Sequence, residues 1–171
     1  MERQSFFASP SICSSMLFCL NGNSRKTVSF PRISPDGRFL LFTQSDYGNF
    51  SIWHPESDLY LLNLATGNIR NIAEINSDNV DSFHTWSSTG RWLVFSSKRL
   101  DGLWARPFFA HFDPETGHFS KPFLLPQKEP DFYDTFTYTY NLPELIKAPV
   151  KTGKKLLETI EEPIHRAKVK N

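Results

Sequence analysis

A strand, a tight turn and a second strand occur twice in this sequence, and this repeat constrains the fold more than any other feature. The first copy covers residues 30–42 and the second covers 83–95, so that Ser34 and Ser87 lie 53 positions apart. Short apolar runs bounded by turn residues are typical of β-strands. A repeat of about 50 residues is typical of proteins built from stacked structural units.

The turn of the first copy has the sequence Ser-Pro-Asp-Gly at 34–37. Pro35 presets φ, Asp36 can accept hydrogen bonds from its local backbone, and Gly37 accepts a positive φ. The second copy has Ser-Ser-Thr-Gly at 87–90, so its turn is less preset. A Thr-Gly pair closes a later hairpin in each copy. We predict structural roles for all of these turn residues: Ser34, Pro35, Asp36, Gly37, Thr66, Gly67, Ser87, Gly90, Thr116 and Gly117.

Each copy contains four predicted strands. In the first copy they are residues 28–33, 39–43, 58–63 and 68–73, and in the second 82–86, 91–97, 106–112 and 118–124. The aromatic content of 15% favours strands, because flat side chains pack well on a sheet face. We therefore predict an all-β fold of two four-stranded antiparallel units, at 28–75 and 82–126.

The sequences Ile-Ser-Pro-Asp-Gly-Arg-Phe-Leu-Leu-Phe at 33–42 and Asp-Leu-Tyr-Leu-Leu-Asn-Leu-Ala-Thr-Gly at 58–67 resemble the TolB-like, WD-repeat-like β-propeller family. In that family the first turn joins the first two strands of a blade and the Thr-Gly turn joins the last two. The second copy departs from the pattern at Ser88 and Thr89, where Pro and Asp are expected. The resemblance covers about 27–146 and implies that the two units are propeller blades.

The region around the second copy resembles a subgroup of large bacterial envelope proteins built on this propeller, through segments 86–97, 123–127, 131–133 and 140–144. Such propellers normally have six blades, and a closed ring needs at least about four. The resemblance therefore implies that the chain is a C-terminal piece of a longer propeller. We expect its first and last sheets to expose faces that further blades would cover, which predicts self-association.

The two ends of the chain are predicted to lie outside the blades. Residues 1–27 are an interrupted apolar stretch that makes a poor secretion signal, and Phe18 stands where a lipoprotein cleavage box has a small residue before Cys19. A leading strand or a ragged end left by truncation are the alternatives. Residues 127–171 form a C-terminal extension with a short amphipathic helix predicted at about 154–162.

Composition excludes several partner classes. No apolar run reaches the roughly 20 residues needed to span a bilayer, so the chain is not predicted to be an integral membrane protein. The net charge of +1 hides a basic tail, which we interpret as a solvated end rather than a nucleic-acid contact. Cys13 and Cys19 lack the spacing of a zinc or haem site.

The sequence contains no catalytic constellation that we recognise. A serine hydrolase needs its nucleophile on a strained GxSxG turn, whereas Ser34 and Ser87 occupy the repeated turns. The histidines lack the HExxH or facial-triad spacing of metal sites, and no calcium loop or phosphate-cradling Gly-rich loop is present. We therefore predict no enzyme activity, no metal and no cofactor.

The loops after the second strand of each copy emerge on the same rim of a propeller and are the predicted contact surface. Aromatic and arginine side chains at a rim are frequent binding anchors. The alternative is that the loop tryptophans merely cover the ends of the sheets. The candidate residues are Trp53, His54, Lys98, Arg99, Asp101, Trp104 and Arg106.

The resemblance implies a noncatalytic scaffold that binds a protein or peptide in the periplasm or envelope of a bacterium. An alternative is the propeller portion of a prolyl-oligopeptidase-type serine peptidase, whose separate catalytic domain is absent from this sequence. A third possibility is a nonfunctional gene fragment.

Overall fold

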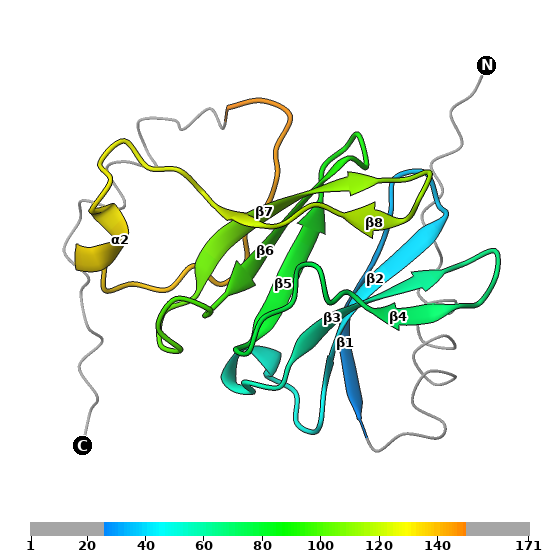
Figure 1. Cartoon of the computed structure of the whole chain (residues 1–171), viewed down its shortest axis with the longest axis horizontal. Helices are drawn as coiled ribbons and strands as arrows, with labels where there is room; N and C mark the ends of the chain where they lie inside the picture. The colour runs from blue at the N-terminus through cyan, green and yellow to red at the C-terminus, as the bar shows by residue number, and fades with distance from the viewer. Residues whose placement is uncertain (1–25, 150–171) are drawn as a thin grey trace, which may run out of the picture.

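Two antiparallel sheets, one from each sequence copy, make up the fold (Figure 1). The computed structural model describes residues 26–149. The first sheet has the order β1-β2-β3-β4, with bounds Thr27–Ile33, Phe39–Ser45, Asp58–Asn63 and Ile69–Asn71. The second has the order β5-β6-β7-β8, with bounds Asp81–Trp86, Trp92–Ser97, Arg106–Asp113 and His118–Phe119, and β9 (Phe123–Leu124) also pairs with β7. The predicted all-β fold with two blade-like sheets is confirmed.

The outer strand of the second sheet differs from the prediction, because it is split into β8 and β9. Three residues, 120–122, oppose only two residues of β7. Ser120 Oγ accepts the amide of His111 at 3.0 Å, and Pro122 has no amide to donate. The second sheet therefore has five strands where four were predicted, although β8 and β9 pair with the same strand.

The two inner turns have the same geometry despite their different sequences. In the first, Ser34 Oγ accepts the amide of Phe39 at 3.0 Å and donates to Asp36 Oδ1 at 2.6 Å. In the second, Ser87 Oγ accepts the amide of Trp92 at 3.1 Å and lies 3.0 Å from Thr89 Oγ1. A threonine hydroxyl thus replaces a carboxylate, so Ser87 keeps the same backbone contact without the Pro-Asp pair.

The repeat extends to an irregularity of the backbone that the sequence did not reveal. Phe30 and Phe83 have positive φ, 54° and 41°, and each lies where the register of its sheet's first strand shifts. Positive φ is uncommon for residues with a side chain and often marks a bulge. The two rings meet edge to face with centroids 4.9 Å apart, so the bulges bring the first strands of the two sheets into contact.

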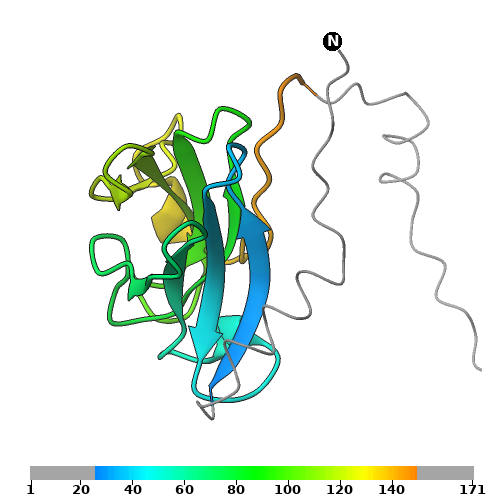
Figure 2. The ribbon, with the colours of Figure 1, turned by 90° about the vertical axis from the view of Figure 1, so that its right-hand side faces the viewer.

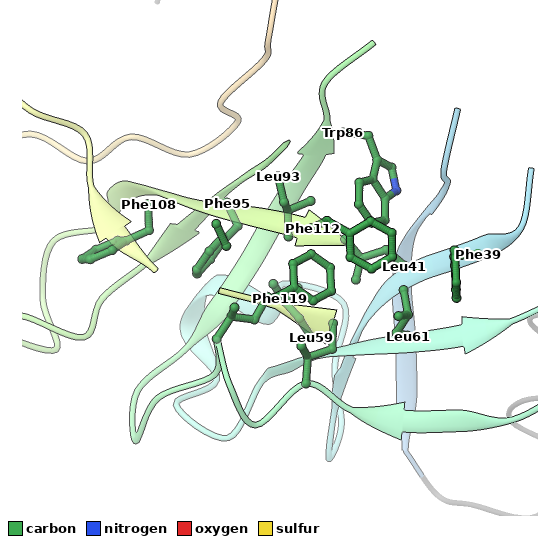
Figure 3. Close-up of a cluster of buried hydrophobic side chains, with 13 residues drawn as sticks. Phe39, Leu41, Leu59, Leu61, Trp86, Leu93, Phe95, Phe108, Phe112 and Phe119 are labelled. Atoms are coloured by element: carbon green, nitrogen blue, oxygen red, sulfur yellow. The ribbon is translucent and has the colours of Figure 1, made fainter. Parts of the chain in front are cut away.

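An apolar core lies between the facing sides of the two sheets (Figure 3). Phe112 of β7 is fully buried, and its ring lies 5.2 Å from that of Phe39 and 5.0 Å from that of Trp86. Trp86 also donates its indole N–H to the carbonyl oxygen of Arg32 at 3.2 Å, which joins the sheets through a polar bond as well. The first sheet and the residues that follow β4 supply most of the aliphatic side chains of this core: Leu41, Leu59, Leu61, Ile72 and Ile75.

The outer faces of the sheets are more covered than the sequence led us to expect. On the first sheet Leu40, Phe42 and Leu62 are buried, with at most 5% exposure. On the second sheet an open apolar pocket of about 390 Å³ remains, where Trp92 and Phe123 are each about two-fifths exposed. On the first sheet Ile69, the register partner of Leu62, is also 42% exposed, so the expectation of open faces holds for part of each sheet.

The C-terminal extension runs beside the second sheet after a four-residue helix, α2 (Phe132–Thr135) (Figures 1 and 2). Ser96 Oγ lies 2.8 Å from the carbonyl oxygens of both Tyr140 and Asn141, and the Tyr140 amide donates to Ala105 at 3.0 Å. The extension is thus tied to β6 and the start of β7. The helix predicted at about 154–162 lies outside the described residues.

His84 is a buried neutral group between the sheets. It lies on β5, and its Nε2 is 3.3 Å from the carbonyl oxygen of Leu41 on β2. Burial lowers the pKa of the imidazole from 6.5 to about 4, and the nearby Arg32 acts in the same direction. Because the unfolded chain binds this proton more tightly, protonation favours unfolding.

We predict that stability falls as pH decreases from about 6.5 to about 4. The free energy of unfolding should be lower at pH 4.5 than at pH 7.5 by about 2 to 3 kcal/mol from this residue alone. Urea denaturation of wild type and His84→Gln at both pH values isolates the contribution of His84, since the glutamine side chain is neutral at both. Equal losses in the two proteins would show that His84 is not the group responsible.

Candidate binding groove at the sheet ends

A groove of about 180 Å³ lies where loops from the two sheets meet. One wall is the loop between β2 and β3, which contains the 3-10 turn η1 (Ser51–Trp53), and the other is the loop between β6 and β7. Ser51 Oγ and Ser82 Oγ are 2.6 Å apart, so a buried hydrogen bond joins the first loop to the second sheet. The lining residues are Ile52, Trp53, Pro55, Asn79, Val80, Lys98, Gly102 and Leu103.

Two of the predicted rim residues, Trp53 and Lys98, come together in this groove. The ammonium of Lys98 lies 4.3 Å from the centre of the Trp53 ring, which is within cation–π range. Lys98 is only 6% exposed, whereas Trp53 is 74% exposed. Burial lowers the pKa of the Lys98 amine, and Asp101 partly opposes that shift.

The floor of the groove is apolar and fixed. Ile52, Val80 and Ala105 form a buried cluster against which Phe83 packs. The amide of Lys98 donates to the carbonyl of Val80 at 3.1 Å, which fixes the start of the second loop on this cluster. Lys98 therefore enters the groove from an anchored backbone, and its ammonium lies over the Trp53 ring.

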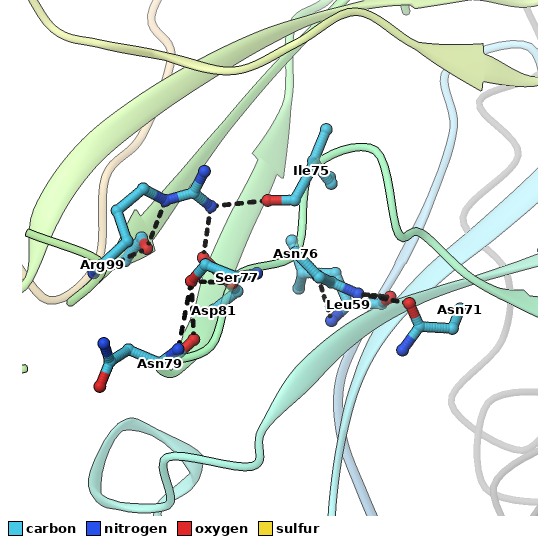
Figure 4. Close-up of polar contacts among 9 residues, drawn as sticks. Leu59, Asn71, Ile75, Asn76, Ser77, Asn79, Asp81 and Arg99 are labelled. Atoms are coloured by element: carbon cyan, nitrogen blue, oxygen red, sulfur yellow. Dashed lines mark hydrogen bonds and ion pairs between the residues drawn. The ribbon is translucent and has the colours of Figure 1, made fainter.

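A polar network holds the segment between the sheets beside the groove (Figure 4). Arg99 donates to Asp81 at 2.7 Å and to the carbonyl of Ile75 at 2.6 Å. Asp81 also accepts the amide and the hydroxyl of Ser77, at 2.7 and 2.8 Å. Burial raises the pKa of the Asp81 carboxyl even with Arg99 beside it. Arg99, which we predicted at the rim, thus binds its own chain.

The remaining loop candidates also contact the chain itself. His54 lies against the Tyr47 ring, with centroids 4.5 Å apart, and its Nδ1 is 3.4 Å from Glu56. Asp101 accepts the amides of Leu103 and Trp104 at 2.8 and 2.9 Å, so it closes the turn of the second loop. Trp104 is half-buried.

Arg106 is buried and anchors the C-terminal extension rather than facing solvent. Its guanidinium donates to the carbonyls of Tyr138 at 2.5 Å, Phe136 at 2.6 Å and Tyr133 at 3.3 Å. The rings of Tyr133 and Phe136 lie 5.4 Å from the same group. We predicted Arg106 at the rim because it lies at the start of β7, next to the β6–β7 loop. This prediction was wrong, since the side chain points to the C-terminal extension.

Six of the eight lining residues were not predicted from the sequence: Ile52, Pro55, Asn79, Val80, Gly102 and Leu103. Asn79 lies in the connection between the sheets, and Leu103 is 68% exposed in the second loop. Ile52 lies directly before Trp53, so two adjacent apolar residues in the β2–β3 loop were the available signal. An exposed leucine beside Gly102 was a similar signal in the second loop.

Residues 26–149 contain neither a cluster of metal ligands nor a membrane-spanning helix. No group of three or more His, Cys, Asp or Glu side chains there is arranged to hold a metal ion. Within the same part of the chain, no helix has the length and apolarity required to cross a membrane.

Comparison with known proteins gives structural matches alone. No protein-family model matches the sequence, and no curated protein matches it. One similar structure is the β-propeller domain of the Trilobed protease from Pyrococcus furiosus, with 24% identity over 59% of this chain and a TM-score of 0.40. Another is TolB from Acinetobacter baumannii, with 19% identity over 56% of this chain and a TM-score of 0.36. The matches cover 30% and 20% of those chains.

We predict that Arg106→Met releases the C-terminal extension. Three carbonyl groups lose a charged donor, which should lower the free energy of unfolding by about 3 kcal/mol. Hydrogen exchange should show loss of protection at the Tyr140 amide before global unfolding. Arg106→Lys keeps the charge but cannot reach three carbonyls, so its effect should be intermediate.

Arg91→Met is the matched control, because Arg91 is an exposed arginine in the second sheet's inner turn. Its effect on stability should stay within about 0.5 kcal/mol. Normal Tyr140 protection in Arg106→Met would contradict the anchoring role.

Proposed function

We propose that this chain is part of a noncatalytic β-propeller scaffold that binds a protein or peptide partner in a bacterial cell envelope. The binding site is the groove between the β2–β3 and β6–β7 loops. The envelope location rests on the sequence resemblance to propeller-containing envelope proteins. Cell fractionation of a bacterium that expresses the chain tests the location, with recovery in the periplasm or envelope expected.

The observation that carries this proposal is the pairing of an exposed tryptophan with a fixed lysine. Trp53 is the most exposed tryptophan or leucine side chain of the described residues, and Lys98 holds one face of its ring at 4.3 Å. Partly rigid tryptophans beside pockets are frequent hot spots of protein interfaces. An unrestrained aromatic side chain would lose more conformational freedom when a partner binds. The contact with Lys98 therefore lowers the entropy cost of binding at Trp53.

The shape of the groove supports a short segment of a partner rather than a small metabolite. A volume of about 180 Å³ is below the range of about 300 to 1,000 Å³ of typical small-molecule sites. It suffices for one or two side chains of a peptide. Further exposed apolar side chains lie in the same two loops and extend the contact surface: Tyr47, Phe50, Leu100 and Leu103.

A random-peptide display library selected on the full chain tests the proposal. Enriched peptides are synthesised, and their dissociation constants are measured by calorimetry with wild type, Trp53→Ala and Trp92→Ala. We expect Trp53→Ala to weaken binding at least about tenfold, as a hot-spot residue does. Trp92 is the matched control, because it is a partly exposed tryptophan on the outer face of the second sheet.

Two results would contradict the proposal. One is the absence of any enriched peptide, or binding that depends on Trp92 and not on Trp53. The other is hydrolysis of the enriched peptides by the purified chain, measured by mass spectrometry, which would contradict the noncatalytic role. A peptidase propeller without its catalytic domain would bind such peptides without cleaving them, so sequence beyond this chain distinguishes that alternative.

A further inference from the structure

We infer that the groove selects an acidic side chain, Asp or Glu, flanked by an apolar residue in an extended segment of the partner. This inference rests on the proposed peptide-binding function and adds the chemistry of the ligand. The carboxylate would lie on the ammonium of Lys98, and the apolar neighbour would pack on Trp53 and Leu103.

Lys98 is the first support for this inference. The residue is 6% exposed, and no carboxylate of the described residues lies within ion-pair distance of its ammonium. A lysine that is largely covered and has no acidic partner leaves its positive charge uncompensated. The ring of Trp53 supplies only a partial partner, so a ligand carboxylate would complete the site.

Asn79 is the second support. Its side chain lines the same groove, and its amide group makes no hydrogen bond within the described part of the chain. The amide oxygen lies 3.3 Å from the ideal Cβ position of Gly102, so the two walls are close at this point. An ammonium and a carboxamide in one groove offer donors for both oxygens of a carboxylate.

Nearby acidic groups do not occupy this position. Asp101 is the charged group that acts on Lys98, and its Oδ1 accepts two backbone amides of its own turn. Asp81 on the other side is bound by Arg99 and Ser77. Neither carboxylate lies within ion-pair distance of Lys98, so its ammonium is available to a ligand carboxylate.

An internal side chain fits the groove better than a chain end. The walls come from two separate loops, and exposed apolar residues occur in each, with Phe50 at 69% and Leu100 at 54% exposure. A segment that passes between the loops contacts both sets, whereas a C-terminal carboxylate would end at Lys98. We therefore assign the carboxylate to an aspartate or glutamate side chain.

The test uses three mixtures of N-acetylated octapeptides on the immobilised full chain, with binding measured by surface plasmon resonance. The first has Asp or Glu at the centre beside Trp or Leu, with an amidated end. The second is identical but has Asn or Gln at the centre. The third has Gln at the centre and a free C-terminal carboxylate. We expect the first to bind at least about tenfold more tightly than the other two, as charge-assisted hydrogen bonds require.

Variants link the preference to Lys98. Lys98→Met should abolish the difference between the acidic and amide mixtures, and Lys98→Arg should retain it. Lys121→Met, which removes an exposed lysine of the second sheet, should leave it unchanged. Circular dichroism of each variant confirms that the compared proteins are folded, and Lys98→Arg keeps the test decisive if Lys98→Met unfolds.

The outcomes separate the two proposals. If all peptides bind equally and binding is lost in Trp53→Ala, the binding function stands and the acidic preference is overturned. Tighter binding of the third mixture would overturn the choice of a side-chain carboxylate. If none of the mixtures binds, the inference is overturned, and the display selection decides separately whether the proposed function stands.

Discussion

The aromatic contact of Phe112 with both sheets is the interaction on which the rest of the structure depends. Each sheet has one face covered with apolar side chains, and a single small sheet cannot bury such a face by itself. Phe112 fills the space between Phe39 and Trp86. The second sheet supplies most of the rings of this core, while the first copy of the repeat, residues 28–75, supplies most of its aliphatic side chains. Packing of rings against branched side chains gives a dry interior that neither copy of the repeat could form by itself.

The groove exists because this core fixes how the two sheets lie. Its walls belong to different sheets, so a change in their packing would change the distance between Trp53 and Lys98. Two hydrogen bonds between the sheets limit that freedom: the buried Ser51–Ser82 bond and the bond from the Trp86 indole to the carbonyl of Arg32. The site is therefore a consequence of sheet packing, and the loops need little rigidity of their own.

Strand positions were largely predictable from the sequence, since they follow from local patterns of apolar and turn residues. The third strand was predicted with the bounds that the structure has, Asp58–Asn63. The sequence did not predict the bulges at Phe30 and Phe83 or the break at Ser120, because these irregularities depend on pairing between strands. The site was predictable only in part. The prediction that Arg106 lies at the rim was wrong, because its partners are backbone carbonyls about 30 residues away, which a sequence pattern does not show.

The most direct test of this account is hydrogen exchange in the Phe112→Ala variant, with the half-exposed Phe123→Ala as control. Removing a fully buried ring should cost about 3 to 5 kcal/mol. If the two sheets are one cooperative unit, the paired amides of Leu41 and Leu61 in the first sheet should lose as much protection as those of the second. Unchanged protection in the first sheet, with loss confined to the second, would contradict the claim that the shared core holds the molecule together.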